Sequence, residues 1–383
     1  MGLRVANIVE EGRLGGPQIR IAEVAKHLND VNIETTVILP KYQSEAFKKK
    51  LEVYNIKTTT LPLRRLTKDK RHLMMYGLFL FHEIFILYKY FKKEKFDLIH
   101  CSGGAWQFKG VIAGSLTRSK TIWHLNDTNI QIIIRFLFLN LTRFLVDGII
   151  VAGKQVKEYY FEHLGPQTIP IFEIQAPVDT SAFDPNKIKK DLKIMEHTGL
   201  KIVTVGNINP LKGIEYFVEM ASILNNKYDD LNFFMVGSIF SSQRKYLKRI
   251  FELINKFGLK NIHFYGASDN IPSILKAADI YVCSSIAEAS PISVWEAMAM
   301  KKPVVTTDVG DVSRFIRNGE NGFVVPIRNA IALAEKASFL IKDENIRNLF
   351  GQKARMVAIQ HLDINICVKK HIQFYRQVLE DKI

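Results

Sequence analysis

The sequence predicts an α/β protein made of two Rossmann-like domains, each a doubly wound parallel sheet, and three observations support this. The chain has 383 residues, more than a single hydrophobic core normally organises. Each half opens in the same way, with an apolar strand, a glycine-containing loop and a helix. After each opening, apolar strands alternate with amphipathic helices, which is the pattern of parallel sheets covered by helices on both faces.

The expected elements follow the chain in order. In the first half, a strand at residues 3–9 leads through Gly15-Gly16-Pro17 into a helix that ends near Leu28. In the second half, a strand at residues 201–205 leads through a loop into a helix that begins near Gly213. Further strands are expected at residues 35–39, 98–101 and 121–123 of the first half and at residues 233–236, 263–265, 280–283 and 303–306 of the second.

The domain boundary is expected in the segment 176–185, which contains two prolines and several turn-forming residues. We assign residues 1–178 to an N-terminal domain, 179–363 to a C-terminal domain, and 364–383 to a C-terminal helix that packs across their junction. Ligands of doubly wound sheets bind outside the carboxyl ends of the strands. Two such domains facing each other therefore predict a binding cleft between them.

The composition indicates a globular protein, with 47% hydrophobic and 24% charged residues. The three cysteines, Cys101, Cys283 and Cys367, are far apart and odd in number. This favours a reducing compartment, with neither a disulfide framework nor a metal-binding spacing. The first expected strand starts almost at the N-terminus, which leaves no room for a signal peptide, so a cytoplasmic location is expected.

A surplus of basic residues is concentrated in one stretch of the N-terminal half. The net charge is +15; residues 41–95 hold 14 Lys and Arg against 5 Asp and Glu, and residues 1–180 as a whole hold 25 against 17. The stretch includes Lys48-Lys49-Lys50 and the segment from Arg64 to Arg71. Such a patch suits phosphates, acidic glycans, anionic lipid headgroups or nucleic acid, and a solvated face is the alternative.

Two apolar stretches, residues 73–91 and residues 130–150, raise the question of a membrane span. Both are interrupted by charged or polar residues: His82, Glu83 and Lys89 in the first, and Arg135, Asn140, Arg143 and Asp147 in the second. Charges are costly at the centre of a bilayer, so neither stretch is expected to span it. We interpret both as buried helices; alternatively, one of them rests on a membrane surface beside the basic stretch.

Two glutamates flank a predicted helix N-terminus. Glu288 and Glu296 lie on either side of Ser290 and Pro291, which suit the cap and the first position of a helix. The free N–H groups and the positive dipole end of such a helix bind anions. A phosphate at this helix end, with one acid on each side, indicates a nucleotide-sugar site.

Other nucleotide and metal motifs do not occur in the sequence. Neither opening carries Gly-x-Gly-x-x-Gly followed by an acid, and there is no Walker A lysine motif and no Asp-x-Asp pair. A bound diphosphate would therefore be neutralised by helix ends and basic side chains. We expect no cofactor and no metal ion.

Residues 201–326 resemble the donor domain of the retaining glycosyltransferases of family 4, which have the two-domain GT-B fold. The resemblance rests on the order and spacing of short motifs, namely Val205-Gly206, Lys212-Gly213, Phe264-Tyr265-Gly266, Ala277-Ala278-Asp279, Glu288 with Glu296, Ala297-Met298-Ala299, Lys302-Pro303-Val304-Val305 and residues 321–326. The N-terminal half matches less specifically, through Gly15-Gly16 and through His100 and His124 at the ends of expected strands.

This resemblance implies roles for individual residues. Glu288 would bind the donor sugar and steady positive charge at its anomeric carbon, Lys212 would pair with the diphosphate, and His124, in the loop after its strand, would contact the sugar. The donor-binding set implied is Gly15, Gly16, Asn207, Lys212, Gly266, Ser290, Pro291, Ile292 and Glu296. Within it, Glu296 accepts the ribose hydroxyls, the amides near Ser290 hold the distal phosphate, and Gly266 approaches the base.

Asn207 departs from the family, which usually has arginine at this position. A guanidinium makes two parallel contacts to phosphate, whereas asparagine supplies a neutral amide. Either another basic residue compensates, or the affinity for diphosphate is lower. His100 is a weaker site candidate, and we expect a structural role for it.

The expected activity is that of a metal-independent, retaining hexosyltransferase in the cytoplasm. A nucleoside-diphosphate sugar bound by the C-terminal domain would react with a hydroxyl of a glycan or polyprenyl-linked acceptor held by the N-terminal domain. Attack from the face that the leaving phosphate vacates would retain the anomeric configuration. Cell-surface polysaccharide synthesis would fit, with peripheral contact at the inner membrane face.

Four other functions stay open at this point. A sugar-nucleotide epimerase could share the architecture, and so could a phosphorylase, although no pyridoxal lysine site is identified. A non-catalytic sugar-nucleotide-binding protein, inactive because of Asn207, is the third. A nucleic-acid-binding protein would explain the charge, yet no known nucleic-acid-binding module occurs in the sequence.

Overall fold

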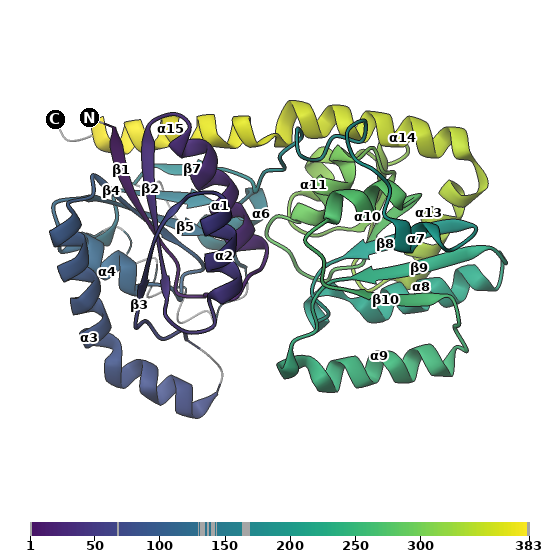
Figure 1. Cartoon of the computed structure of the whole chain (residues 1–383), viewed down its shortest axis with the longest axis horizontal. Coiled ribbons are helices and arrows are strands. Elements are labelled where there is room, and N and C mark those ends of the chain that lie inside the picture. The colour runs from purple at the N-terminus through teal and green to yellow at the C-terminus, as the bar shows by residue number, and fades with distance from the viewer. Residues whose placement is uncertain are drawn as a thin grey trace. The chain divides into compact units, whose positions relative to one another are not determined.

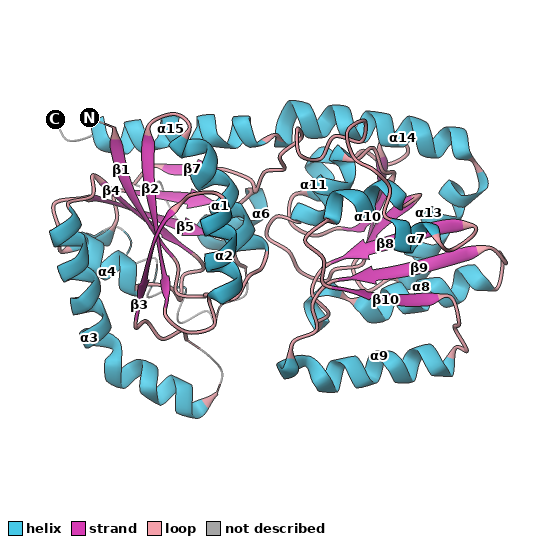
Figure 2. Ribbon diagram, viewed as in Figure 1, coloured by secondary structure: helices cyan, strands magenta, loops and turns pink. Residues whose placement is uncertain are grey.

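The computed structural model describes residues 2–66, 69–128, 130, 135, 138, 142, 144–162 and 169–380. Contacts divide the chain into two compact units, one formed by Met1–Ala176 together with Ile364–Ile383 and the other by Pro177–Asp363. Each unit is a parallel sheet covered by helices (Figures 1 and 2). The predicted fold class, two doubly wound Rossmann-like domains, is therefore confirmed.

The first unit holds a seven-stranded sheet in the order β3-β2-β1-β4-β5-β6-β7. Its strands are β1 Leu3–Ile8, β2 Ile33–Pro40, β3 Lys57–Leu61, β4 Leu98–Ser102, β5 Lys120–Leu125, β6 Gly148–Val151 and β7 Ile171–Glu173. Its helices are α1 Gly16–Asn29, α2 Glu45–Val53, α3 Lys70–Glu94, α4 Lys109–Ser115, α6 Lys154–Phe161 and α15 Ile364–Glu380. The strand order reverses between β1 and β4, so a ligand crevice is expected at the carboxyl ends of these strands.

The second unit holds a six-stranded sheet in the order β10-β9-β8-β11-β12-β13. Its strands are β8 Leu200–Val205, β9 Leu231–Val236, β10 Ile262–Gly266, β11 Ile280–Cys283, β12 Val304–Thr307 and β13 Gly322–Val325. Its helices are α7 Leu192–Met195, α8 Ile214–Asn225, α9 Arg244–Lys256, α10 Ile271–Ala277, α11 Ile292–Ala299, α12 Val312–Phe315, α13 Ala330–Lys342 and α14 Glu344–Val357, with 3₁₀ turns η1 Pro210–Lys212 and η2 Ser241–Gln243 and a π-helical turn η3 Ala358–Leu362. The order reverses between β8 and β11.

Both sheets are buried on their two faces, which explains the continuous apolar runs of their central strands. In the first unit, the last helix of the chain completes the core. Val368, Phe374 and Val378 of α15 belong to the same buried cluster as Val5 of β1 and Ile122 of β5. Each such side chain contributes roughly 1.5–3 kcal/mol through burial, so α15 is part of this unit. Its predicted packing across the domain junction stays a prediction.

Four strands were not predicted as strands, namely β3, β6, β7 and β13, and β13 entered the sequence analysis only within the motif at residues 321–326. β3 is an edge strand with a Lys-Thr-Thr-Thr-Leu sequence, and β7 is an edge strand of only three residues. Both lack the apolar run of a central strand. β6 is the end of the apolar stretch 130–150, which was interpreted as a helix; the strand corrects its last part, and most of the remainder lies outside the described residues.

The expectation that residues 73–91 form a buried helix is only half right. In α3, Tyr76, Glu83, Ile84, Leu87 and Phe91 are buried, while the opposite side is exposed and apolar. Among the described parts of the chain, no helix combines the length and the apolar character that crossing a membrane requires.

Candidate functional site

Two predicted site residues meet at the point where the order of the second sheet reverses. Lys212 ends the turn after β8, and Glu288 lies in the loop after β11. The Lys212 ammonium donates a hydrogen bond to Glu288 Oε1, and the Ser285 hydroxyl donates to the same oxygen at 2.8 Å. The structure therefore brings together the residue that the resemblance assigns to the diphosphate, Lys212, and the residue that it assigns to the donor sugar, Glu288.

Gly213 makes this approach of the two loops possible. Its φ is +57°, and a Cβ at this position would stand 2.1 Å from the carbonyl oxygen of Ser284. The Ser284 hydroxyl also donates to the carbonyl oxygen of Lys212 at 3.1 Å. A side chain at position 213 would push the turn that carries Lys212 away from β11.

The electrostatics of the pair keep Lys212 charged. Burial alone would lower the pKa of the Lys212 ammonium, but the charge of Glu288, the hydrogen bond that Lys212 donates to it and the charge of Glu296 outweigh burial, and the pKa is raised. Glu296, in the second turn of α11, lies close enough to raise the pKa of Lys212 by its charge. The Lys212 ammonium thus lies near the carboxylates of Glu288 and Glu296, which are both half-buried.

The predicted helix start needs correction. The helix α11 begins at Ile292 and its cap residue is Pro291, so Ser290 and Pro291 each lie one position further from the helix than expected. The Ser290 hydroxyl accepts a hydrogen bond from the indole N–H of Trp295 at 3.2 Å and does not cap the helix. A fully buried indole N–H needs an acceptor, and Ser290 is within its reach.

The amides assigned to the distal phosphate are also corrected in part. Pro291 has no N–H, and the N–H of Ile292 donates to the carbonyl oxygen of Ser290 at 3.0 Å. The predicted set of Ser290, Pro291 and Ile292 therefore offers fewer phosphate donors than expected. Their role in binding a donor stays a prediction.

Asn207 and Gly266 lie along the carboxyl edge of the same sheet. The N–H of Gly237 donates to the Gly266 carbonyl at 2.9 Å, and a Cβ at Gly237 would stand 2.0 Å from the Gly206 carbonyl. The loops after β8, β9 and β10 are therefore in direct backbone contact. The side-chain oxygen of Asn207 accepts from the N–H of Ser238 at 3.3 Å and links two of these loops.

In the first unit, Gly15 is the cap residue of α1 and Gly16 its first residue. A Cβ at Gly15 would meet only the Gln18 side-chain oxygen, at 3.4 Å, an ordinary contact. The protein itself therefore does not require glycine at position 15. The close approach of a phosphate, which the resemblance implies, stays a prediction.

His124 does not lie in a loop, as the sequence suggested, but inside β5, and it is fully buried. Its Nδ1 is 3.1 Å from an Arg20 guanidinium nitrogen and 3.0 Å from His100 Nε2. Burial, followed by the charge of Arg20, holds the pKa of His124 well below its usual value. His100, whose Nδ1 is 2.7 Å from the Tyr375 hydroxyl, belongs to the same cluster.

Sequence analysis missed Arg20 altogether. The sequence pattern could have indicated that Arg20 is buried, because it lies four residues before Val24 and eight before Leu28, on the apolar face of α1. A charged residue in such a stripe requires a special environment. Ser285 was missed too, although it lies only two residues beyond β11.

A second buried cluster contains part of the basic stretch. The ammonium of Lys109, itself fully buried, is 2.7 Å from Glu83 Oε2 and 3.4 Å from Glu10 Oε2. The Arg64 guanidinium is 2.6 Å from Glu83 Oε1. Burial raises the pKa of Glu10 to about 7, although the charge of Lys109 opposes this rise. Arg64 is therefore paired within the protein, although a third of its side chain is exposed, and Arg65 is paired with Glu11 at 2.6 Å.

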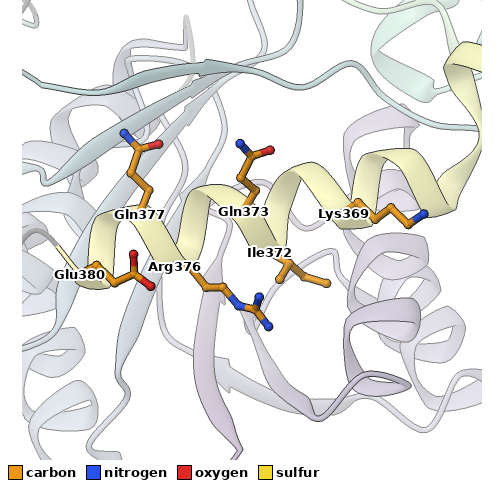
Figure 3. Close-up of a pocket in the computed structure, with 6 residues that line it drawn as sticks. All are labelled: Lys369, Ile372, Gln373, Arg376, Gln377 and Glu380. Carbon is orange, nitrogen blue, oxygen red and sulfur yellow. The ribbon is translucent and has the colours of Figure 1, made fainter.

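A hollow of about 530 Å³ lies along α15 and is shown in Figure 3. Its lining side chains all come from this one helix: Lys369, Ile372, Gln373, Arg376, Gln377 and Glu380. None of the predicted site residues contributes to it. We therefore place the candidate site at the carboxyl edges of the sheets.

Comparison with known families and structures agrees with this geometry. Residues 14–182 match the family model Glycosyltransferase Family 4, and residues 186–357 match the model Glycosyl transferases group 1. The chain belongs to glycosyltransferase family 4, as the sequence predicted.

Two curated relatives illustrate the similarity. The N,N'-diacetylbacillosaminyl-diphospho-undecaprenol alpha-1,3-N-acetylgalactosaminyltransferase of Campylobacter jejuni is 31% identical over 170 residues, 44% of this chain and 43% of that protein. The UDP-Gal:alpha-D-GlcNAc-diphosphoundecaprenol alpha-1,3-galactosyltransferase of Escherichia coli is 24% identical over 311 residues, 77% of this chain and 79% of that protein. The match to the first relative thus spans less than half of its length.

Solved structures share the whole fold. A glycosyltransferase from Rickettsia africae superimposes with a TM-score of 0.83 at 22% identity, covering 100% of both chains. The Anabaena protein Alr3699/HepE, crystallised with UDP and glucose, superimposes with a TM-score of 0.83 at 18% identity, covering 98% of this chain and 100% of that one. The predicted GT-B fold is confirmed.

Proposed function

We propose that this protein is a retaining, metal-independent glycosyltransferase that moves a sugar from a nucleoside-diphosphate sugar to a hydroxyl of a glycan or lipid-linked acceptor. The observation that carries the proposal is the Lys212–Glu288 pair, with Glu296 close enough to influence Lys212, at the reversal point of the second sheet. A cation and two carboxylates at this edge suit a ligand with a diphosphate at one end and hydroxyl groups on both sides.

Each residue has a defined task in the proposed reaction. The bond between the anomeric carbon and the diphosphate oxygen breaks, its electron pair goes to the diphosphate, and Lys212 offsets the added negative charge. Glu288 steadies the positive charge that develops on the sugar. The acceptor oxygen bonds to the same face of that carbon, and its proton passes to the leaving phosphate. Glu296 holds the ribose hydroxyls.

The names of the relatives support particular substrates. The Anabaena crystal structure contains UDP and glucose, and the name of the Escherichia coli relative specifies UDP-Gal, so we propose a UDP-sugar as the donor. Both curated relatives are named for acceptors that are saccharides on diphospho-undecaprenol. A saccharide linked to a polyprenyl diphosphate is therefore the proposed acceptor, with cell-surface polysaccharide as the product.

Glu296→Ala is expected to abolish the stabilisation that the donor gives. In a thermal-shift series with UDP, GDP, ADP and CMP and their common sugar conjugates, UDP compounds should raise the melting temperature of the wild type. A ligand at 100 times its dissociation constant stabilises by about 2.7 kcal/mol, and this gain should disappear in Glu296→Ala.

The control for this experiment is Glu219→Ala, which removes a half-buried glutamate from α8. This variant should respond to UDP compounds as the wild type does. If no nucleotide shifts the wild type, the donor site is wrong. If UDP-sugar is consumed at full rate without any acceptor, the epimerase alternative is favoured, and binding without turnover favours the non-catalytic one.

We further propose that α3 seats the protein on an anionic membrane surface. Met74, Leu78, Phe81 and Phe85 recur at helical spacing and are 66%, 72%, 80% and 50% exposed, so they form one apolar stripe on this helix. Exposed cations stand at both ends of the helix: Lys70, Arg71, Lys89, Lys92 and Lys93. An apolar stripe between basic ends is the pattern of a helix lying in a lipid interface.

Vesicle binding tests this surface. The wild type should sediment with vesicles that contain phosphatidylglycerol and much less with pure phosphatidylcholine. The double variant Leu78→Ser, Phe81→Ser should bind at least about tenfold more weakly, since burying each apolar side chain is worth about 1.5–3 kcal/mol. Phe339→Ser, which removes a phenylalanine that is 47% exposed from α13, should bind normally. Equal binding by all three proteins would refute the proposal.

A further inference from the structure

Arg20 lies in an unusual environment for a buried cation. Its guanidinium contacts the rings of His124 on β5 and His371 on α15, at 3.1 and 3.2 Å, and no carboxylate of the described chain forms an ion pair with it. Burial raises the pKa of the neighbouring Cys367 thiol to about 11, so this group is uncharged as well. Burying an arginine without a counterion is expensive, and the arrangement calls for an explanation beyond packing.

The chemistry of arginine decides where the protons of this cluster are. A guanidinium can only donate hydrogen bonds, so His124 Nδ1 and His371 Nε2 must both be unprotonated acceptors. The proton of His371 is then on Nδ1, which lies 2.8 Å from the carbonyl oxygen of Cys367 and donates to it.

The same reasoning extends to the third histidine. His100 Nε2 is 3.0 Å from the acceptor His124 Nδ1, so His100 must carry its proton on Nε2. Its Nδ1 then accepts from the Tyr375 hydroxyl, at 2.7 Å. Arg20, Tyr375 and the three histidines are all buried. With three neutral rings each of these contacts has a donor and an acceptor, and Arg20 and His100 share the lone pair of His124 Nδ1. The network has one consistent arrangement of protons.

Within the described part of the chain, two donors of this network have no hydrogen-bond partner: Arg20 Nε, which is also buried, and the proton-bearing nitrogen of His124. With Nδ1 unprotonated, neutral His124 carries its proton on Nε2, and Nε2 is buried with no hydrogen-bond partner in the protein. A buried donor without an acceptor costs about 1–3 kcal/mol. His124 is the last residue but one of β5, at the carboxyl edge of the sheet, where doubly wound folds bind their ligands.

We propose that Arg20 is a positioning residue that locks His124 in its Nε2–H form, so that His124 donates a hydrogen bond to a hydroxyl or phosphate oxygen of the substrate and does not act as a base. This inference rests on the proposed function for the identity of the substrate, but not for the state of the ring. It also agrees with a reaction in which the leaving phosphate takes the acceptor proton.

The state of the ring can be read without any substrate. In full-length protein labelled with ¹⁵N-histidine, the His124 signals are assigned by their loss in His124→Gln. The wild type should show a protonated Nε2 and an unprotonated Nδ1. In Arg20→Met the lock is removed, and the signals should become those of a mixture of both tautomers. Protonated Nδ1 in the wild type would overturn the proposal, whatever the activity.

Tyr375→Phe is the matched control, because it removes one buried hydrogen bond from the same cluster but leaves Arg20 in place. It should keep the His124 signals of the wild type. If the cluster has only a structural role, both substitutions should change the His124 signals equally. That result would refute the proposal that Arg20 fixes the His124 tautomer.

Titration with UDP-glucose and with UDP then tests the hydrogen bond. Arg20→Met and His124→Gln should each bind UDP-glucose, or both ligands, about tenfold more weakly. The double variant should bind no more weakly than either single variant.

The ligand that is affected identifies the hydrogen-bond acceptor. Weaker binding of UDP-glucose alone identifies a sugar hydroxyl, and weaker binding of both UDP-glucose and UDP identifies a phosphate oxygen. Additive losses in the double variant would contradict the coupling. If the wild type binds neither ligand, the proposed function fails while the ring assignment stands.

Discussion

Lys212→Met is expected to lower kcat/KM by about 100- to 1,000-fold, the loss found when one preorganised group that stabilises developing negative charge is removed. Lys212 is the cation that meets Glu288 at the reversal point of the second sheet, and its pKa is raised by the surrounding carboxylates, so it is charged at neutral pH. The measurement is initial-rate transfer from a UDP-sugar, with substrate concentrations that separate kcat from KM. The loss should appear mainly in kcat, because diphosphate charge grows in the transition state.

Two comparisons make this result specific. Lys256→Met removes an exposed lysine at the end of α9 and should leave the rate unchanged. In Lys212→Met, Glu288 loses its cation, so the fold of the variant must be checked by melting temperature. Lys212→Met combined with Glu288→Gln should recover any lost stability but no activity. Recovery of activity in this double variant would mean that Lys212 serves only as a counterion for Glu288.

Lys109→Met is expected to destabilise the first unit by about 3–5 kcal/mol, the cost of removing one partner from a buried ion cluster. Lys109 is fully buried between Glu83 and Glu10, and methionine cannot replace its charge. Glu10, with a pKa of about 7, can become neutral by protonation, but Glu83 keeps only Arg64 as its cation. The loss is measured by segment-resolved hydrogen exchange in increasing urea, which separates the first unit from the second.

The control is Lys48→Met, because Lys48 of α2 pairs with Glu52 at 3.6 Å and both side chains are about half exposed. Such a pair is worth about 0–1 kcal/mol, so this variant should unfold at nearly the wild-type urea concentration. Equal losses of stability in the two variants would show that burial of the Lys109 cluster adds nothing to the free energy of unfolding. A loss that extends equally to peptides of the second unit would show that the two units do not unfold separately.

The two predictions differ in what sequence reasoning could supply. Glu288 was identified from the sequence because it lies beside a predicted helix N-terminus, and Lys212 was identified from the resemblance to family 4. Glu296 was found by its spacing from Glu288, and Asn207 and Gly266 were found by the same resemblance. The positions of the strands depend on local apolar patterns that one chain displays, whereas the reversal of strand order that brings these loops together belongs to the folded sheet.

Lys109 and Arg20 could not be recognised in this way. A lysine in a sequence is normally expected to be exposed to solvent. Lys109 can be buried because it pairs with Glu83 of α3 and with Glu10, beyond β1, which lie 26 and 99 positions away in the sequence. Arg64 was counted with the basic surface, yet it is committed to Glu83. The free charge of the stretch is smaller than its composition suggests.

The sequence by itself determined the fold class, the family and the edge of the second sheet where the charged groups gather, because strand periodicity and loop motifs are local properties. The tertiary structure alone decided how those side chains are used: that His124 is inside a strand and bonded to Arg20, and that Ser290 serves an indole and not a helix cap. The protonation, burial and partners of a side chain are set by residues distant in sequence, and only the folded chain brings them within hydrogen-bonding distance.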